Sequence, residues 1–270
     1  VEYFDYYWLH ALAGTNYENV QKVGAFDFLV QKKEEGRIRH IGFSFHDSPE
    51  LLERILKDHP ETEYVQLQLN YLDWDDAALR AKECYEIATR HGKPVIVMEP
   101  IKGGALANIP AKADEILKAE TPGLSTASWA IRFAATHENV MMVLSGMSNM
   151  EQVADNLSYM KDFKPLSEAE MKALKQAADI IRSGIAIPCT ACRYCVSESE
   201  CPKNIAIPDY FALYNDNKNF KGMVSSIYYN NLALTHGKAS ECIGCGKCEK
   251  HCPQHLPIRE YLKDVAEVFG

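Results

Sequence analysis

The segment from Ile38 to Leu56 reads IRHIGFSFHDSPELLERIL and contains one complete strand-and-helix pair. Its first eight residues are mostly apolar, β-branched or aromatic, which is typical of a buried strand. Ser48 and Pro49 then predict the start of a helix, because Ser is a favoured N-cap and Pro suits the first helical position. The apolar residues that follow at the spacing of one helix face are Leu51, Leu52, Ile55 and Leu56.

The same alternation continues on both sides of this segment. Strand-like runs lie at 3–10, 38–45, 63–70, 94–98 and 140–145, and each is followed by a helical pattern. Such alternation predicts parallel strands that are joined by right-handed helical crossovers, either in a doubly wound open sheet or in a (β/α)8 barrel. An open sheet that binds a dinucleotide normally has G-x-G-x-x-G after its first strand, and none stands there.

The barrel is favoured because five pairs of roughly 32 residues match the pitch of an eight-pair barrel of about 250 residues. The predicted fold class is therefore α/β, with an incomplete (β/α)8-type barrel of about five pairs. On this interpretation about three pairs would precede Val1.

Composition excludes several classes of partner. The chain has 270 residues and a formal charge of −8, without a cluster of Lys and Arg that would bind a nucleic-acid backbone. No run approaches the roughly 18 apolar residues of a membrane span, and no signal peptide is recognisable. We expect a cytoplasmic protein with neither a nucleic-acid nor a membrane partner.

Eight of the nine cysteines lie beyond residue 188, which is unlike a disulfide framework spread over a secreted chain. The second run, Cys242-x2-Cys245-x2-Cys248-x3-Cys252-Pro253, has the spacing of two-cluster ferredoxins at every position. The first run, Cys189-x2-Cys192-x2-Cys195, is followed by Cys201-Pro202 after five residues where three are usual. The remaining cysteine, Cys84, falls on an apolar helix face and is predicted to be a buried thiol.

In two-cluster ferredoxins the fourth cysteine of each run serves the other cluster. This pattern predicts one [4Fe-4S] cluster on Cys189, Cys192, Cys195 and Cys252, and a second on Cys242, Cys245, Cys248 and Cys201. Structural zinc is the alternative, but it prefers two Cys pairs or Cys/His mixtures over three cysteines at x2 spacing.

Three domains are predicted from these patterns. Residues 1–160 form the partial barrel, 161–187 a linker helix and 188–270 a small, mainly α-helical ferredoxin-like domain with two clusters. The linker helix is expected to open with the capping box Ser167-x-x-Glu170.

Taken in order, the segments of the chain resemble the aldo/keto reductases, specifically those with a C-terminal ferredoxin-like extension. Five segments resemble the last five strands of that family and the start of its last helix: Asp5–Leu12, Arg39–Ser44, Val65–Tyr71, Met98–Gly104, and Leu144–Gly146 with 151–156. The resemblance covers nearly the whole chain and is specific because the five segments occur in the correct order before the cysteine runs.

The resemblance implies a site for a nicotinamide cofactor. His10 would be the catalytic His that orients the substrate carbonyl, and Ser44 and Gln66 would bind the carboxamide of the nicotinamide. The other residues that it implies for cofactor binding are Met98 beside the nicotinamide ring, Ile101, Gly103 and Gly104 near the pyrophosphate, and Asp155 and Asn156 near the adenine. Phe45 and Gln152 depart from the family pattern, at positions where many members have Asn and Arg.

The leading hypothesis is an NAD(P)H-dependent carbonyl reductase with a small-molecule carbonyl substrate, NAD(P)H and two [4Fe-4S] clusters. The Tyr, Lys and Asp of the family's catalytic set would precede Val1, so the chain by itself is expected to be inactive. A hydride carries two electrons and a cluster passes one, so the clusters would serve a redox partner protein or act as a structural staple. The alternative is a ferredoxin-type electron-transfer protein with a non-catalytic barrel remnant.

Overall fold

The computed structural model describes residues 1–14, 16–76, 79–184, 186–189, 191, 193–199, 201–220, 223–252 and 255–270. The chain divides into two compact units. The N-terminal unit comprises Val1–Ala178 and the C-terminal unit comprises Asp179–Gly270, and each is described by itself. The division falls within helix α8 (Glu168–Ser183). The domain boundaries at 160 and 187 stay a prediction.

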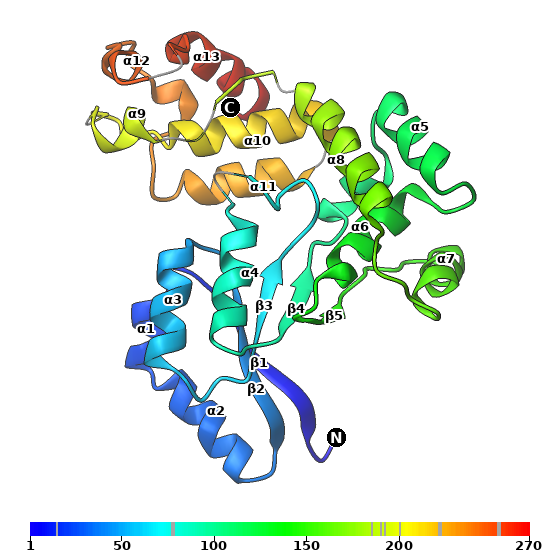
Figure 1. Ribbon diagram of the computed structural model, residues 1–270. Helices are drawn as coiled ribbons and strands as arrows, with labels where there is room; N and C mark the ends of the chain where they lie inside the picture. Colours follow the sequence, from blue (N-terminus) through cyan, green and yellow to red (C-terminus); the bar gives the residue numbers. More distant parts are fainter. Residues whose placement is uncertain are drawn as a thin grey trace. The chain divides into compact units, whose positions relative to one another are not determined.

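The N-terminal unit is built on a five-stranded parallel sheet (Figure 1). Its strands are β1 (Phe4–Leu12), β2 (Ile38–Phe45), β3 (Tyr64–Gln68), β4 (Val95–Met98) and β5 (Val140–Val143). They are paired in sequence order. A doubly wound sheet would reverse its strand order at a switch point, so this order is that of a β/α barrel. Within the described residues, β1 and β5 each pair on one side only, and the predicted incomplete barrel is confirmed.

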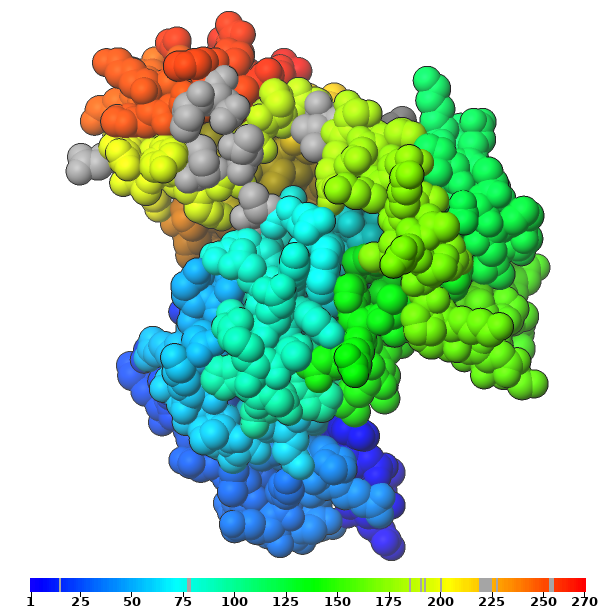
Figure 2. Space-filling view, viewed as in Figure 1, coloured from blue at the N-terminus to red at the C-terminus, as the bar shows by residue number. Residues whose placement is uncertain are grey.

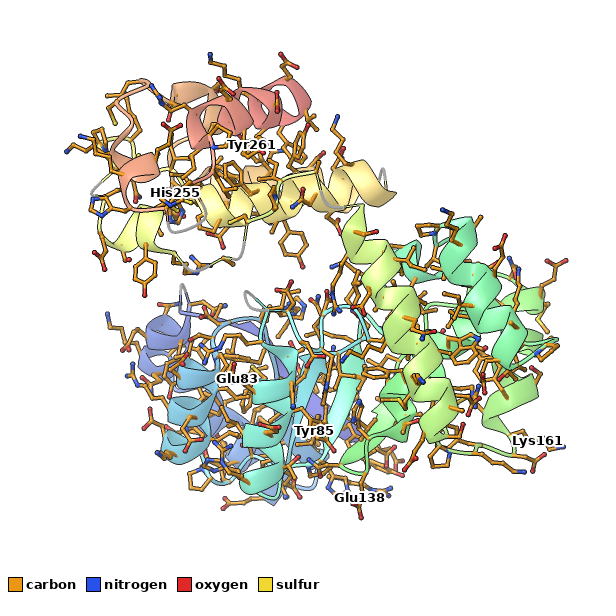
Figure 3. All side chains as sticks on the ribbon, turned by 45° about the horizontal axis from the view of Figure 1, so that its top comes forward. Glu83, Tyr85, Glu138, Lys161, His255 and Tyr261 are labelled. Carbon is orange, nitrogen blue, oxygen red and sulfur yellow. The ribbon has the colours of Figure 1, made fainter. Side chains whose placement is uncertain are left out.

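Helices connect the strands, as the alternating pattern predicted. They are α1 (Tyr17–Lys22), α2 (Ala25–Glu34), α3 (Pro49–Asp58), α4 (Ala81–Arg90), the 3-10 helix η1 (Lys102–Ala107), α5 (Ala111–Glu120), α6 (Thr126–Thr136) and α7 (Met150–Met160). The start of α3 is as predicted, because the Ser48 side chain accepts a hydrogen bond from the Leu51 N–H. Figure 3 shows Tyr85 on α4 near the loop of Glu138, and its hydroxyl accepts a hydrogen bond from the Asn139 N–H at 2.9 Å.

The two faces of the sheet carry different residues because side chains alternate along a strand. One face packs against the helices and forms the core, where Phe43, Val65 and Val97 are fully buried. Leu29 of α2, for example, packs against Ile41 of β2. This face holds the sheet and its helices together.

The opposite face carries aromatic residues at the beginning of the strands and polar residues at their ends. The rings of Tyr6 and Trp8 both meet the ring of Tyr64 edge-on. Gly42 lies beside them on β2, and a Cβ atom there would stand 2.5 Å from the Tyr64 carbonyl oxygen. Only glycine fits at this position, so the aromatic cluster depends on it.

The C-terminal unit is mainly helical, as predicted. After α8 it contains α9 (Tyr194–Ser197), α10 (Ile207–Phe220), α11 (Met223–Leu232), the 3-10 helix η2 (Ala239–Glu241), α12 (Lys247–Lys250) and α13 (Ile258–Phe269). Tyr210, Phe211 and Leu262 belong to a buried core that also contains Cys195 and Cys248. In the space-filling view, the orange and red residues towards the C-terminus form part of the surface of this unit (Figure 2).

The helices of the protein are short. The 16 residues of α8 fall below the roughly 20 that a transmembrane helix needs. Among the described residues, no helix combines the length and the apolar character that crossing a bilayer requires.

Candidate functional site

The carboxyl ends of the strands bring four of the predicted site residues to one face of the sheet. In the parallel register Ser44 is opposite Gln66, and Gln68 is opposite Met98. Alternation along the strands then places Ser44, Gln66 and Met98 on the face that also carries Trp8. His10 follows Trp8 by two residues and shares this face, with an exposed side chain.

Ser44 and Gln66 present complementary hydrogen-bonding groups. Ser44 is 1% exposed, and its Oγ accepts a hydrogen bond from the Ala11 N–H at 2.7 Å, which leaves its own hydroxyl hydrogen to donate. The Gln66 Nε2 donates to Met98 Sδ at 3.2 Å. The Gln66 Oε1 is buried and has no hydrogen-bond partner within the described part of the chain. An unsatisfied buried oxygen costs about 1–3 kcal/mol, so it favours a ligand that can donate a hydrogen bond.

The backbone turns sharply directly after His10. Ala11 has φ of 53°, in the left-handed region that non-glycine residues rarely adopt. The turn is held at both peptide groups, because the Ala11 N–H donates to Ser44 and its carbonyl accepts from Asn16 Nδ2 at 2.8 Å. Burial lowers the pKa of the neighbouring His46, and the charge of His10 lowers it further. His10 is thus fixed at the end of β1 with His46 nearby.

The loop after β4 contains several left-handed residues. Glu99, Lys102, Gly103 and Gly104 have φ of 55°, 48°, 62° and 95°. A Cβ atom at Gly104 would meet no atom within 4 Å, so the backbone of this loop is open to a ligand. Left-handed turns of this kind expose backbone dipoles to anions.

A buried carboxylate anchors this loop. The Asp73 side chain is 4% exposed, and its Oδ1 lies 3.0 Å from Lys102 Nζ. Its Oδ2 accepts hydrogen bonds from Gln68 Nε2 at 2.9 Å and Asn70 Nδ2 at 2.6 Å. Asn70 and Asp73 were not predicted as site residues, although an Asn and an Asp directly after a strand are a signal for such a turn.

Asp155 and Asn156 form hydrogen bonds within the protein. The Asp155 Oδ2 accepts from the hydroxyl of Ser125, the N-cap of α6, at 2.6 Å. The Asn156 Nδ2 donates to Ser145 Oγ at 2.8 Å, and its Oδ1 accepts a hydrogen bond from the Tyr159 hydroxyl. The bonds to Ser125 and Ser145 fix α7 against the start of α6 and the loop that follows β5.

Four cysteines line one cavity in the C-terminal unit. Cys242, Cys245 and Cys248 of the second run share it with Cys201 of the first. The long spacing before Cys201 is accommodated by α9 and the turn after it, where the Ser199 hydroxyl donates to the Cys195 carbonyl. The extra residues therefore do not carry Cys201 away from the second run.

The other predicted ligands lie in or beside the core of the same unit. Cys195 and Cys252 are buried in it, and Cys189 packs against it. The Ala191 N–H points at Cys189 Sγ, at 3.4 Å. Cys192 lies outside the described residues.

The arrangement of the cysteines suits an iron-sulfur cluster better than a single metal ion. Across the described ranges, no three His, Cys, Asp or Glu side chains are gathered as ligands of a single metal ion. A cubane cluster binds each cysteine at a different iron, so its ligands surround a volume rather than a point. The cavity lined by four cysteines suits such a cluster. Burial, above all, raises the pKa of the Cys248 thiol to about 11, and coordination to iron would deprotonate it.

Cys84 differs from the predicted cluster ligands because it lies in the N-terminal unit, away from both cysteine runs in the sequence. It is buried on α4, as predicted, and burial raises its pKa to about 12. A thiol with so high a pKa is a poor nucleophile and a poor ligand.

Both units of the chain are similar to known protein families. The model of the "Aldo/keto reductase family" matches residues 1–179, and that of the "4Fe-4S dicluster domain" matches residues 188–256. Among curated proteins, no match to the chain was found.

Several solved structures share the fold of the N-terminal unit. The aldo-keto reductase AKR11C1 from Bacillus halodurans in its holo form is 23% identical, with a TM-score of 0.52, over 66% of this chain and 59% of that one. An aldo-keto reductase from Klebsiella pneumoniae in complex with NADPH is 19% identical, with a TM-score of 0.50, over 65% of this chain and 59% of that one. The chain thus spans about 60% of the length of the structures that it matches.

Proposed function

Because the chain belongs to the aldo/keto reductase family, we propose that its N-terminal unit binds NAD(P)H and reduces a small-molecule carbonyl compound within the complete barrel. The single observation that carries this proposal is that the Ser44 hydroxyl lies on the residue opposite Gln66 in the strand register, and that the Gln66 Oε1 has no hydrogen-bond partner among the described residues. A primary carboxamide offers one acceptor and two donors, which match these two groups. NADPH bound to the Klebsiella pneumoniae structure supports the choice of cofactor.

The residues of the chain would then have distinct tasks. Ser44 would donate to the carboxamide oxygen, and Gln66 would accept from its amide nitrogen. His10 would donate a hydrogen bond to the substrate carbonyl and orient it. When bound, the nicotinamide supplies the hydride.

The rest of the cofactor would extend away from the strands. The loop of Ile101, Gly103 and Gly104, which is open at Gly104, would face the pyrophosphate, with Lys102 held beside it by Asp73. Asp155 and Asn156 would meet the adenine with the hydrogen-bonding capacity that their contacts with Ser125, Ser145 and Tyr159 leave open.

For the C-terminal unit we propose two [4Fe-4S] clusters, within the predicted domain of residues 188–270. The cavity of Cys201, Cys242, Cys245 and Cys248 supports one of them. Cys189, Cys192, Cys195 and Cys252 would hold the other. When bound, the clusters supply one-electron chemistry. The preceding residues, 161–187, would form the linker helix and 1–160 the barrel part.

The cofactor proposal is tested by titrating the full chain with NAD(P)H and following nucleotide fluorescence. Replacing Gln66→Leu removes the amide and should weaken binding about tenfold, the value of one hydrogen bond to a ligand. Gln31→Leu, on the exposed side of α2, is the matched control and should leave the affinity unchanged. Equal affinities for the two variants would refute the role of Gln66.

The cluster proposal is tested by iron and sulfide analysis after anaerobic reconstitution. The wild-type chain should contain about eight irons, and Cys245→Ser should lose about half of them. Adding Cys201→Ser should cause no further loss, whereas adding Cys252→Ser should remove the remainder. Cys84→Ser is the control and should keep all the iron. A full iron content in Cys201→Ser would contradict the pairing.

The ferredoxin-type alternative is supported by one observation, the exposure of Cys245 at the edge of its cavity. It predicts clusters that dithionite bleaches and a chain that does not bind NAD(P)H. Measurable NAD(P)H affinity in the titration above would reject it.

A further inference from the structure

The cavity of the second cysteine run opens onto a surface of mixed character, which we name the Ile243 surface. Its members are Pro202, Lys203, Ile243, Cys245, Lys247 and Arg259, all of which line the cavity. Ile243 is 60% exposed, and Cys245 is exposed beside it. Ile243 is therefore an exposed apolar side chain at the opening of a cavity that four cysteines line.

The rim of the Ile243 surface is basic. Lys203, Lys247 and Arg259 line the cavity, whereas no Asp or Glu among the described residues does. In the part of the chain that the structure describes, neither Lys203 nor Lys247 forms an ion pair. This positive rim stands out in a chain with a net charge of −8.

Two acidic residues that are close in sequence to the cavity residues form contacts within the protein. Glu249 pairs with Arg259 at 2.9 Å, and Arg259 also donates to the Gly244 carbonyl in the cysteine loop at 3.4 Å. The Glu241 carboxylate accepts a hydrogen bond from the Lys238 N–H. The charges of Lys203 and Lys247, together with that of the exposed Lys250, are left to act on a partner.

We propose that the Ile243 surface docks the acidic face of a small one-electron carrier protein. Exposed apolar and charged side chains that lie together on one surface are typical of a protein interface. Opposite charges steer two such proteins together and orient them. The thiolate of Cys245 would lie at the centre of the contact, where the path from the partner to the cluster is shortest.

This docking proposal rests on the proposed function, because it requires the cluster. The redox step would be the transfer of one electron. One electron would leave the reduced carrier, which is oxidised, and would enter the group held by Cys201, Cys242, Cys245 and Cys248, which is reduced. No bond is formed or broken and no proton is transferred.

The test measures binding, which requires no turnover. The reconstituted full chain is titrated with an oxidised acidic [2Fe-2S] ferredoxin by calorimetry at low ionic strength. The double variant Lys203→Glu/Lys247→Glu should bind at least about tenfold more weakly. Lys218→Glu/Lys263→Glu changes the net charge equally at exposed lysines outside the surface, and should bind within about twofold of wild type.

Three further measurements make the test specific. Ile243→Ser should weaken ferredoxin binding several-fold. The dependence of binding on salt concentration should stay the same, because this substitution leaves the charged residues unchanged. Basic cytochrome c should bind the Lys203→Glu/Lys247→Glu variant more tightly than wild type. The Lys203→Glu/Lys247→Glu variant and the Lys218→Glu/Lys263→Glu control should bind phosphatidylserine vesicles equally.

Several outcomes would overturn the proposal. One is that the ferredoxin does not bind to the wild-type chain that carries its iron. Another is that the surface variant and the control variant lose ferredoxin affinity equally. The third is that the surface variant binds phosphatidylserine vesicles more weakly than its control does, while the two bind the ferredoxin alike. Iron content is measured for every sample. A chain without iron would refute the proposed clusters, whereas a fully loaded chain that ignores the ferredoxin would refute the docking surface alone.

Discussion

At the scale of single residues, His137 shows how burial alone sets a charge state. Its ring stacks on Trp74 with centroids 4.1 Å apart, and Phe133 meets it edge-on. Its Nε2 is buried without a hydrogen-bond partner among the residues described. Burial lowers the pKa of His137 to about 4, so the native ring is neutral at pH 7.

This shift predicts a loss of stability in mild acid. Above pH 6.5 the ring is neutral in both states, and the full stability is present. As the pH falls from 6.5 towards 4, the unfolded chain takes up the proton first, and the free energy of unfolding should drop by on the order of 2 kcal/mol. Urea unfolding at pH 7.5 and pH 4.5 measures this difference. His137→Phe keeps the aromatic packing and should reduce the pH dependence, and an unchanged slope would argue against the assignment.

Gly42 gives a second prediction at this scale. Gly42→Ala would force a methyl group against the Tyr64 carbonyl and ring, and we expect about 2 kcal/mol of destabilisation from overpacking. Gly146→Ala is the matched control, since a Cβ atom there meets nothing within 4 Å. Urea midpoints of the two variants measure the difference. A Gly42→Ala chain as stable as Gly146→Ala would mean that the sheet adjusts at no cost.

At the scale of elements, the sequence pattern predicted what is local. The run 38–45 coincides with β2, and the other four predicted strands overlap β1, β3, β4 and β5. The capping box also forms, because Glu170 N–H donates to Ser167 Oγ and Ser167 N–H donates to Glu170 Oε2. These features depend on residues that are close in sequence, so composition and spacing are sufficient to find them.

Contacts between distant residues could not be predicted in the same way. Arg132 of α6 and Glu170 of α8 form a pair at 2.6 Å in which the side chains are only 9% and 13% exposed. Nothing near either residue in the sequence points to the other. The left-handed Ala11 likewise depends on Ser44, a residue of the next strand. The candidate site was therefore predicted as a set of residues, but its hydrogen bonds were not.

The Asp73 anchor of the loop after β4 is tested at this scale. Asp73→Asn leaves Lys102 facing a neutral amide, and breaking a buried pair in this way should cost about 3 kcal/mol. The loop should then be less ordered, so NAD(P)H should bind several-fold more weakly. Urea unfolding and the fluorescence titration give the two readings.

A surface pair provides the control for the Asp73 anchor. Lys118→Met removes the exposed partner of Asp114 and should change stability by less than about 1 kcal/mol. Equal losses in Asp73→Asn and Lys118→Met would show that burial does not determine the contribution of the ion pair.

At the scale of the whole molecule, each unit has its own source of stability. The N-terminal unit buries a conventional apolar core, whereas Cys195, Cys248 and Cys252 occupy part of the core of the C-terminal unit. If those cysteines hold clusters, the C-terminal unit loses the centre of its core when iron is removed. The N-terminal unit contains no predicted ligand.

Iron removal should therefore destabilise one unit selectively, and the tryptophans allow this to be measured. All three lie in the N-terminal unit, as Trp8, Trp74 and Trp129, so fluorescence excited at the red edge of tryptophan absorption reports that unit alone. Circular dichroism reports the helices of both units. Chelation of iron should lower the melting temperature of one component of the circular dichroism signal and leave the midpoint of the tryptophan transition unchanged. A tryptophan midpoint that falls in parallel would mean that the two units unfold as one cooperative structure.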